Sequence, residues 1–304
     1  MRLFSLATGA MAALIGFGLA PSTRAADPQT GLQIQVVQGL FRDVPPGMVK
    51  VLGGPLRQLI SKKTGLGGDI DLAPDAMTLS DRLKANQCQL GVFHGYEFAW
   101  AKARNPDLIP LVVTVYPSGK PQACIVVHKD STCTCVADLK DGQIVIPSRT
   151  KGHCFAYLAR ERGAEVAPSK VGPLPGIEEA LDAVAGGSSP AALVDVGAVK
   201  GYEKLNPAGA KNLKILCQSE QFPQNVIAYS KGSISDQSAQ QLRQVLTEAH
   251  TTPAGKPLMI LWNITSFAAV PADYAEHLAT SARSYPAPEK QTRAPAVRAV
   301  GMAP

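Results

Sequence analysis

The sequence lacks the local signatures of common enzymes and of nucleic-acid-binding proteins. It has no Gly-x-Ser-x-Gly, no His-Glu-x-x-His and no Walker-type loop, which argues against the enzyme classes that carry those motifs. Its basic residues never form a block of five or six with interleaved aromatics, so nucleic acid is not indicated as a partner. Beyond the N-terminal segment, no apolar run is long enough to cross a bilayer.

Glycine and proline are also too few for a fibrous or low-complexity chain. The 304 residues include 27 Gly and 24 Pro, which are scattered without a period. Hydrophobic residues make up 45% of the chain, so a sizeable core can form and wholesale disorder is excluded. The length favours about two domains of ordinary size.

The N-terminus has the pattern of a secretory signal peptide. Arg2 is followed by an apolar segment over residues 3–20, and small residues at Thr23 and Ala25 predict cleavage after Ala25. The alternative is a membrane anchor, which the lack of a basic stop-transfer flank argues against. Cleavage removes Arg2 and Arg24, so the net charge falls from +6 to +4. We therefore expect an exported, periplasmic protein whose signal peptide spans residues 1–25.

All six cysteines follow this cleavage point, and an even number in an exported protein favours disulfide bonds. Cys133 and Cys135 are too close to bridge each other, so each would need a distant partner. The candidate partners lie in the same middle region of the chain: Cys124, Cys154 and Cys217. The alternative is a metal site that adds His128 and His153, but the spacing matches no closed zinc pattern.

Hydrophobic periodicity predicts a long alternation of strands and helices. The predicted strands are residues 33–37, 89–93, 109–115, 124–127, 143–146, 192–195, 213–217 and 226–229. The predicted helices include 55–63, a short helix around Leu79 and Leu83, 96–104, 152–162, 177–185 and 235–249. Repeated units of this kind are typical of α/β proteins with parallel-type sheets that helices cover on both faces.

Two turn-rich segments, residues 117–121 and 219–223, interrupt this series about 100 residues apart. If both connect the same two lobes, one lobe is discontinuous and the other is inserted in it. We predict a first lobe over 26–117 and 224–285, and a second lobe over 118–223. Residues 286–304 are rich in Pro and Ala without periodicity, which favours a disordered tail.

Several segments resemble the phosphate/phosphite/phosphonate-type solute-binding proteins of ABC importers, which have the type 2 periplasmic-binding-protein fold. They include Gly-Leu-Phe-Arg-Asp-Val at 39–44, Gly-Val-Phe-His-Gly-Tyr-Glu-Phe-Ala-Trp at 91–100 and Ala-Asp-Leu-Lys at 137–140. The resemblance extends from about residue 32 to 285. It implies two α/β lobes that each hold a central sheet, are joined by two hinge crossings and close over an oxyanion. It further implies a monomer without cofactor or catalytic activity, whose partner is an ABC permease at the inner membrane.

The loop over residues 147–152 has the right context for an oxyanion, because it joins a predicted strand to a helix N-terminus. Ser148 and Thr150 can donate hydroxyl hydrogens, and Gly152 allows a close backbone approach. In the family this loop resembles a Ser-Thr-Ser-Gly run, which here carries Arg149 and Lys151 at the serine positions. That exchange brings charge-assisted donors. The alternative is an ordinary capped helix start.

The first lobe should supply the opposite wall of the site. His94 lies at a strand-to-helix junction, where open α/β sheets bind ligands, although it can equally be a turn or core histidine. Phe41 and Arg42 follow the first strand in a similar position, and Arg42 can clamp an oxyanion or pair with Asp43. The resemblance places Phe98 where the family has a ligand-contacting Tyr, and Tyr96 lies two residues away.

The resemblance also implies roles for two acidic positions. Glu178 and Glu179 fall near a family His-Asp pair, and Asp195 falls near a family Asp. Those acids contact the amine side of some phosphonates in the family.

Other functions are also compatible with the sequence. A binding module that serves a periplasmic sensor would need no importer, and the cysteine cluster could instead carry a metal or a redox reaction. A thiol nucleophile at Cys154 beside His153 is disfavoured, because adjacent residues on a helix point apart.

Overall fold

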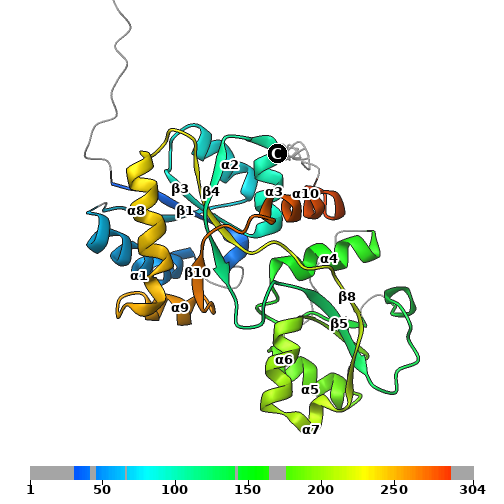
Figure 1. The fold of residues 1–304 in the computed structure, drawn as a ribbon. Helices are drawn as coiled ribbons and strands as arrows, with labels where there is room; N and C mark the ends of the chain where they lie inside the picture. Colours follow the sequence, from blue (N-terminus) through cyan, green and yellow to red (C-terminus); the bar gives the residue numbers. More distant parts are fainter. Residues whose placement is uncertain (1–30, 42–45, 66, 141–142, 164–175, 289–304) are drawn as a thin grey trace, which may run out of the picture. The chain divides into compact units, whose positions relative to one another are not determined.

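The computed structural model describes residues 31–41, 46–65, 67–140, 143–163 and 176–288. The predicted signal peptide lies outside these residues, as does the predicted tail from residue 289 onward. Within residues 31–288 the described chain forms two β-sheets, each covered by helices (Figure 1). No helix in these described ranges is both long and apolar enough to cross a bilayer.

The larger sheet has six strands in the order β10-β4-β9-β3-β1-β2. They are β1 (Ile34–Val37), β2 (Ile70–Ala73), β3 (Leu90–Phe93), β4 (Leu108–Val115), β9 (Val226–Ser230) and β10 (Ser266–Ala268). Strand β1 pairs in parallel with β2 and β3, whereas β9 pairs antiparallel with β3 and β4. Strand β9 therefore brings a late part of the chain back into the middle of the sheet that the first 115 residues begin.

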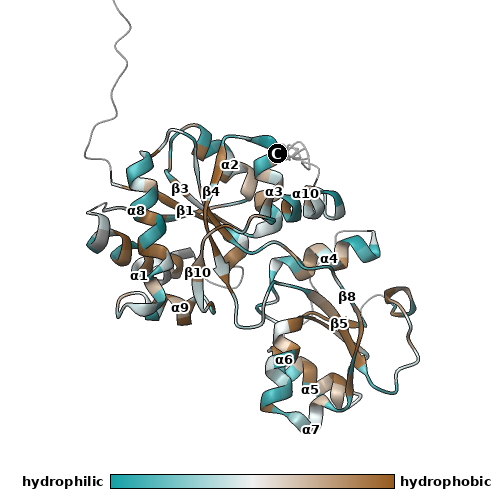
Figure 2. Ribbon diagram, in the orientation of Figure 1, coloured by the Kyte–Doolittle hydropathy of each residue, from teal (hydrophilic) through white to brown (hydrophobic). Residues whose placement is uncertain are grey.

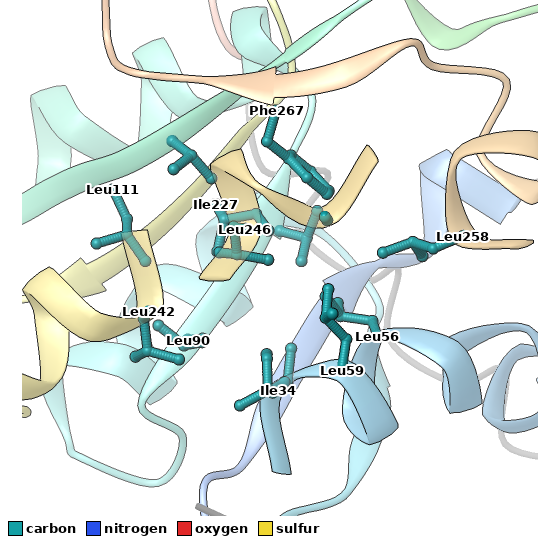
Figure 3. Packing of buried hydrophobic residues seen from close by; sticks show 14 of the residues in the cluster. Ile34, Leu56, Leu59, Leu90, Leu111, Ile227, Leu242, Leu246, Leu258 and Phe267 are labelled. Carbon is teal, nitrogen blue, oxygen red and sulfur yellow. The ribbon is translucent and has the colours of Figure 1, made fainter. Parts of the chain in front are cut away.

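A hydrophobic cluster covers each face of this sheet. Neighbouring residues of one strand enter opposite clusters, as Val36 and Val37 do, because side chains alternate along a strand. The first cluster packs beneath α1 (Pro46–Thr64), α8 (Asp236–Thr247) and α9 (Lys256–Leu261). Figure 3 shows its side chains converging from these helices and the strands. The second cluster packs beneath α2 (Ala76–Lys84), α3 (Gly95–Arg104) and α10 (Tyr274–Ser284).

The smaller sheet has four strands in the order β6-β7-β5-β8. They are β5 (Ala123–His128), β6 (Ile144–Val145), β7 (Ala191–Asp195) and β8 (Leu213–Gln218). Helix α4 (Gly152–Arg162) contributes Tyr157 and Leu158 to the cluster on one face. Helices α5 (Ile177–Ala185) and α6 (Val196–Leu205) cover the other face, and the short α7 (Pro207–Ala210) follows them. Figure 2 shows that the strands at the centre of this sheet are mainly hydrophobic.

The chain passes between the two sheets twice, from β4 to β5 and from β8 to β9. Both passages contain the turn-rich segments found in the sequence. The two segments are hydrogen-bonded to each other: Phe222 N donates to Pro121 O at 2.8 Å, and Gln122 Nε2 donates to Ser219 O at 2.9 Å. The predicted α/β architecture of two lobes joined by two crossings is therefore confirmed.

The sheets are mixed, so the prediction of parallel-type sheets was wrong. Strand β5 is antiparallel to both β7 and β8, and only β6 pairs with β7 in parallel. An apolar run of four to eight residues indicates that a strand is buried on both faces, and it carries no information on strand direction.

Several helices have the bounds that the sequence predicts. Helix α5 has the predicted bounds, and α4 begins and ends as predicted, with Gly163 in the left-handed region at its end (φ 65°). Helix α1 begins nine residues before Pro55, which lies inside the helix. Six elements were not predicted from the sequence: β2, β10, α6, α7, α9 and α10. Of these, α6 and α10 are amphipathic helices of 10 and 11 residues.

The cysteines do not form the predicted disulfide bonds. All six, each of them within the described ranges, are free thiols. Cys88, Cys124 and Cys154 are completely buried in the hydrophobic clusters, and burial raises the pKa of the first two to about 12. These thiols act as small apolar core residues, a role that their spacing along the sequence could not distinguish from cross-linking.

Candidate functional site

A cavity of about 510 Å³ lies among residues of both lobes. The first lobe lines it with Val36, Gly39, Leu40, Phe41, Met48, Val92, His94, Thr114, Tyr116, Asn225, Leu261, Trp262, Asn263 and Ile264. The second lobe lines it with Arg149, Thr150 and Lys151. The lining thus has an extended apolar part and a compact cationic part. None of these lining residues is acidic.

The cationic part is the loop between β6 and α4. Arg149 has a φ of 61°, in the left-handed region that side chains other than glycine rarely adopt. Thr150 closes the turn, since both its backbone N and its hydroxyl donate to Pro147 O, the hydroxyl at 2.6 Å. The helix then begins at Gly152, and the N-cap residue Lys151 provides no side-chain cap. The positive end of the α4 dipole and two cationic side chains therefore meet at one side of the cavity.

Asp195 is close to this loop, and its carboxylate partly neutralises the positive charge of Lys151. Its Oδ2 is 3.6 Å from Lys151 Nζ and 2.8 Å from His153 Nε2, and its Oδ1 accepts from Gly197 N at 2.8 Å. Burial opposes ionisation of Asp195, but His153 and Lys151 favour the charged form and bring its pKa below the usual value. Lys151 Nζ also lies over the Tyr116 ring, 5.2 Å from its centre. Asp195 thus orients Lys151 and does not itself line the cavity.

His94 follows β3 and is the N-cap residue of α3, as its position in the sequence predicts. It lines the cavity, and its ring stacks on Tyr96 at 5.5 Å. Tyr96 does not line the cavity; its ring packs against Trp100 and Phe222. A Cβ atom added at Gly152 would lie 2.6 Å from the Tyr96 hydroxyl, so Gly152 permits contact between the lobes.

The apolar part of the cavity comes from the segments around Phe41 and Trp262. Their rings meet edge to face at 6.3 Å, and Trp262 also packs against Phe267 at 6.1 Å. Arg42, which the sequence singled out beside Phe41, lies outside the described residues.

Besides Tyr96, Gly152 and Asp195, three more predicted site residues lie away from the cavity lining. Phe98 is completely buried in the core beneath the larger sheet, beside Phe93, so the structure gives no support to a ligand contact for its ring. Ser148 is half-buried in the loop but is not a lining residue. Glu178 is exposed in the first turn of α5, where Glu179 accepts from Gly176 N.

The sequence reading missed the cavity residues that are contributed by the two crossings and by the segment after α9. Tyr116 and Asn225 belong to the crossings, and Trp262 to Ile264 follow α9. The residue type at position 263 was a local signal of a left-handed turn, because after glycine Asn best tolerates a positive φ. In the structure Asn263 has a φ of 49°. Its approach to the loop at Arg149 depends on the tertiary fold.

The metal alternative finds no support in the geometry. Within the described ranges, which contain Cys133, Cys135, Cys154, His128 and His153, no three His, Cys, Asp or Glu side chains gather closely enough to hold a metal ion.

The fold is similar to that of solved binding proteins. A binding component of a phosphonate ABC transporter from Pseudomonas aeruginosa superposes with a TM-score of 0.53 at 17% identity, over 84% of this chain and 88% of that one. A Prochlorococcus marinus protein in complex with methylphosphonate superposes with a TM-score of 0.56 at 12% identity, over 84% of this chain and 97% of that one. A Xanthomonas citri protein bound to ATP superposes with a TM-score of 0.56 at 16% identity, over 84% of this chain and 97% of that one. At these low sequence identities, the structural similarity establishes the fold alone.

A comparison with curated proteins finds no match. A family model matches residues 43–274, and it describes the periplasmic substrate-binding protein of phosphonate ABC transporters. This confirms the resemblance drawn from the sequence, and it confirms that the protein is a binding protein and not an enzyme. The chain belongs to the family of phosphonate-binding periplasmic proteins of ABC transporters.

Proposed function

We propose that the chain binds a small oxyanion of the phosphonate, phosphite or phosphate type in the cavity, against the loop that carries Arg149, Thr150 and Lys151. One observation carries the proposal: Arg149 and Lys151, the N-cap residue of α4, line a cavity whose described lining has no carboxylate. Backbone N–H groups at a helix start and charge-assisted donors both favour an anion.

The remaining residues shape this environment. Thr150 uses its hydroxyl hydrogen within the loop, so its side chain can offer only an acceptor to a ligand. Arg149 and Lys151 are therefore the main side-chain donors of the loop, in place of the serines of the family pattern. An arginine can bind two oxygens of one anion at once, which favours a tetrahedral or planar oxyanion over a halide.

We further propose that the lobes, 26–117 with 224–285 and 118–223, close over the ligand about the two crossings. The closed monomer would then deliver its cargo to an ABC permease at the inner membrane, after export and removal of residues 1–25. The family membership and the cavity residues contributed by both crossings support this proposal.

A thermal-shift experiment tests the binding step. The mature protein is heated with phosphate, phosphite, methylphosphonate, sulfate or arsenate. At about 100 times Kd, a ligand that binds only the native state adds about 2.7 kcal/mol, which raises Tm by about 5 °C for a chain of this size. If none of the five anions shifts Tm, the proposal is wrong.

Variants locate the binding site. Arg149→Gln and Lys151→Gln should each weaken the best anion by about tenfold or more, because each removes a charge-assisted donor. The matched control is Lys204→Gln, which removes the same charge from an exposed position on α6. Equal loss in all three variants would indicate a general charge effect and contradict the site.

A further inference from the structure

The cavity has two chemically distinct parts, and the cationic loop occupies only one of them. The other part is apolar and comes from β1, β3, the start of α1 and the end of α9, together with neighbouring residues such as Phe41 and Trp262. An oxyanion placed against this surface would lose hydration without gaining partners, which is costly. The apolar part therefore suits a portion of the ligand that carries no charge.

The size of the cavity leads to the same conclusion. The cavity of about 510 Å³ has room for more than a bare oxyanion. In the conformation described, a bare phosphate or methylphosphonate held at the loop would leave apolar side chains of the lining in contact with solvent. A larger ligand would remove this apolar surface from water, which is favourable at about 25 cal/mol per Å².

The charge of the lining limits what the second portion can be. An ammonium substituent would gain most from a carboxylate, and none occurs among the described lining residues. The Glu97 carboxylate lies close to the lining at Gly39, where an added Cβ would be 3.5 Å from its Oε1. The two acidic positions suggested by the family resemblance do not supply one: Glu178 is exposed on α5, and Asp195 is paired with Lys151 and His153. The apolar side chains of the described lining therefore favour a neutral substituent.

The edge-to-face pair of Phe41 and Trp262 adds a preference for shape. Aromatic rings favour further edge-to-face or offset contacts at 4.5–7 Å between centres. Both rings line the cavity, so a third ring from a ligand can join them.

We propose that the ligand is an organic phosphonate or phosphate monoester with an uncharged, apolar substituent about the size of an aromatic ring. The oxyanion binds the loop at Arg149 and Lys151, and the substituent packs against Phe41, Met48, Leu261 and Trp262. This inference rests on the proposed function, since it assigns the second half of the same site.

Calorimetry with a series of probes tests the inference on the mature protein. The probes are phosphate, methylphosphonate, 2-aminoethylphosphonate, phenylphosphonate and phenyl phosphate. Phenylphosphonate should bind at least about tenfold tighter than methylphosphonate, because burial of a ring contributes more than 1.4 kcal/mol. It should also bind tighter than 2-aminoethylphosphonate. Phenyl phosphate distinguishes carbon–phosphorus ligands from esters, and tight binding of either aromatic probe supports the proposal.

Two other outcomes separate the inference from the proposed function. If methylphosphonate or 2-aminoethylphosphonate binds as tightly as both aromatic probes, this inference is wrong and the oxyanion function stands. If no probe binds, the oxyanion function itself is wrong, and the assignment of the substituent is overturned with it.

Variants of exposed lining residues test the apolar part without risk to the core. Met48 and Leu261 are 52% and 41% exposed, so Met48→Ser and Leu261→Ser should leave folding intact. The double variant should weaken phenylphosphonate about tenfold and change methylphosphonate less than twofold. Val51→Ser and Ile260→Ser are matched controls on the same two helices, 71% and 82% exposed and outside the lining. Equal losses for both probes in the Met48 and Leu261 variant would overturn the proposal.

Discussion

At the scale of single residues, Asp195 shows how one carboxylate serves structure and site together. Its Oδ1 caps α6 through Gly197 N, and its Oδ2 faces His153 and Lys151. The side chain is only 6% exposed, so its charge is poorly screened and acts on the loop directly. It therefore reduces the positive potential that Lys151 contributes to the cavity.

Asp195→Asn should consequently strengthen oxyanion binding while weakening the fold. Asn is a good N-cap residue and can keep the contact with Gly197, but it no longer neutralises Lys151. We expect Kd for the best anion to fall about threefold to tenfold. Stability should decrease because His153 and Lys151 lose an anionic partner. Calorimetry and urea denaturation measure the two effects.

The control for Asp195→Asn is Asp236→Asn, which makes the same charge change at an exposed position on α8. It should leave Kd unchanged. Weaker oxyanion binding by Asp195→Asn would contradict this prediction and indicate that Asp195 aids binding, either by orienting Lys151 or by contacting the ligand, as the family resemblance implied.

The stability that Asp195 supplies also depends on pH. Its pKa is lower in the folded protein than in the unfolded chain, so the unfolded state binds more protons in acid. The contribution is complete above the unfolded pKa of about 4 and is lost as pH falls through the folded value. Wild-type protein should therefore lose more stability than Asp195→Asn below about pH 4, as measured by urea denaturation. Parallel losses would contradict this.

At the scale of secondary-structure elements, the start of α3 must pass very close to the second crossing. A Cβ atom added at Gly95 would overlap the carbonyl oxygen of Pro223 and lie 2.6 Å from that of Gln224. Both obstacles are backbone atoms, which cannot move aside as a flexible side chain can. Helix α3 therefore needs glycine at its first position, and His94 owes its place beside the cavity to this packing.

Gly95→Ala should lower the free energy of unfolding by about 2 kcal/mol or more, because the crossing must shift. Gly201→Ala is the matched control: Gly201 lies within α6, and an added Cβ would have no atom within 4 Å. This control should raise stability by about 0.5–1 kcal/mol through helix propensity. Urea denaturation measures both, and equal effects would contradict the packing argument.

At the scale of the whole molecule, Tyr285 connects segments that are far apart in the sequence. Its hydroxyl donates to Glu220 Oε2 at 2.9 Å, and Glu220 also pairs with Arg160 of α4 at 2.7 Å. Its carbonyl oxygen accepts from Trp100 Nε1 of α3 at 2.6 Å, and its ring lies 4.5 Å from that of Phe222. Burial and the Glu220 carboxylate raise the pKa of Tyr285. The residue therefore ties helices of both lobes to the second crossing.

Tyr285→Ala should reduce stability by about 3–5 kcal/mol, because a buried aromatic ring is lost. Tyr285→Phe should cost about 1–2 kcal/mol, since only the donor to Glu220 is removed. Denaturation followed by Trp fluorescence measures both variants. If Tyr285→Ala proved no worse than Tyr285→Phe, the ring would have no part in joining the lobes.

Sequence patterns by themselves determined the α/β class, the two crossings and the bounds of α4 and α5. These features depend on local periodicity, on turn residues such as those of 117–121, and on the glycine that ends α4. The family could also be identified, since its motifs are distributed along nearly the whole matching region. The loop with Arg149 and Lys151 was predicted because a strand-to-helix junction is a local feature.

Only the tertiary structure decided strand direction, the state of the cysteines and the second half of the cavity. Strand β9 enters the larger sheet beside β3 and β4, more than 100 residues earlier in the chain, and no local pattern specifies that pairing. Phe98 and Phe41 are the same residue type, yet Phe98 lies in the core and Phe41 lines the cavity. The reason is physical: local periodicity shows that a side chain is buried, and only the packing of distant segments determines what buries it.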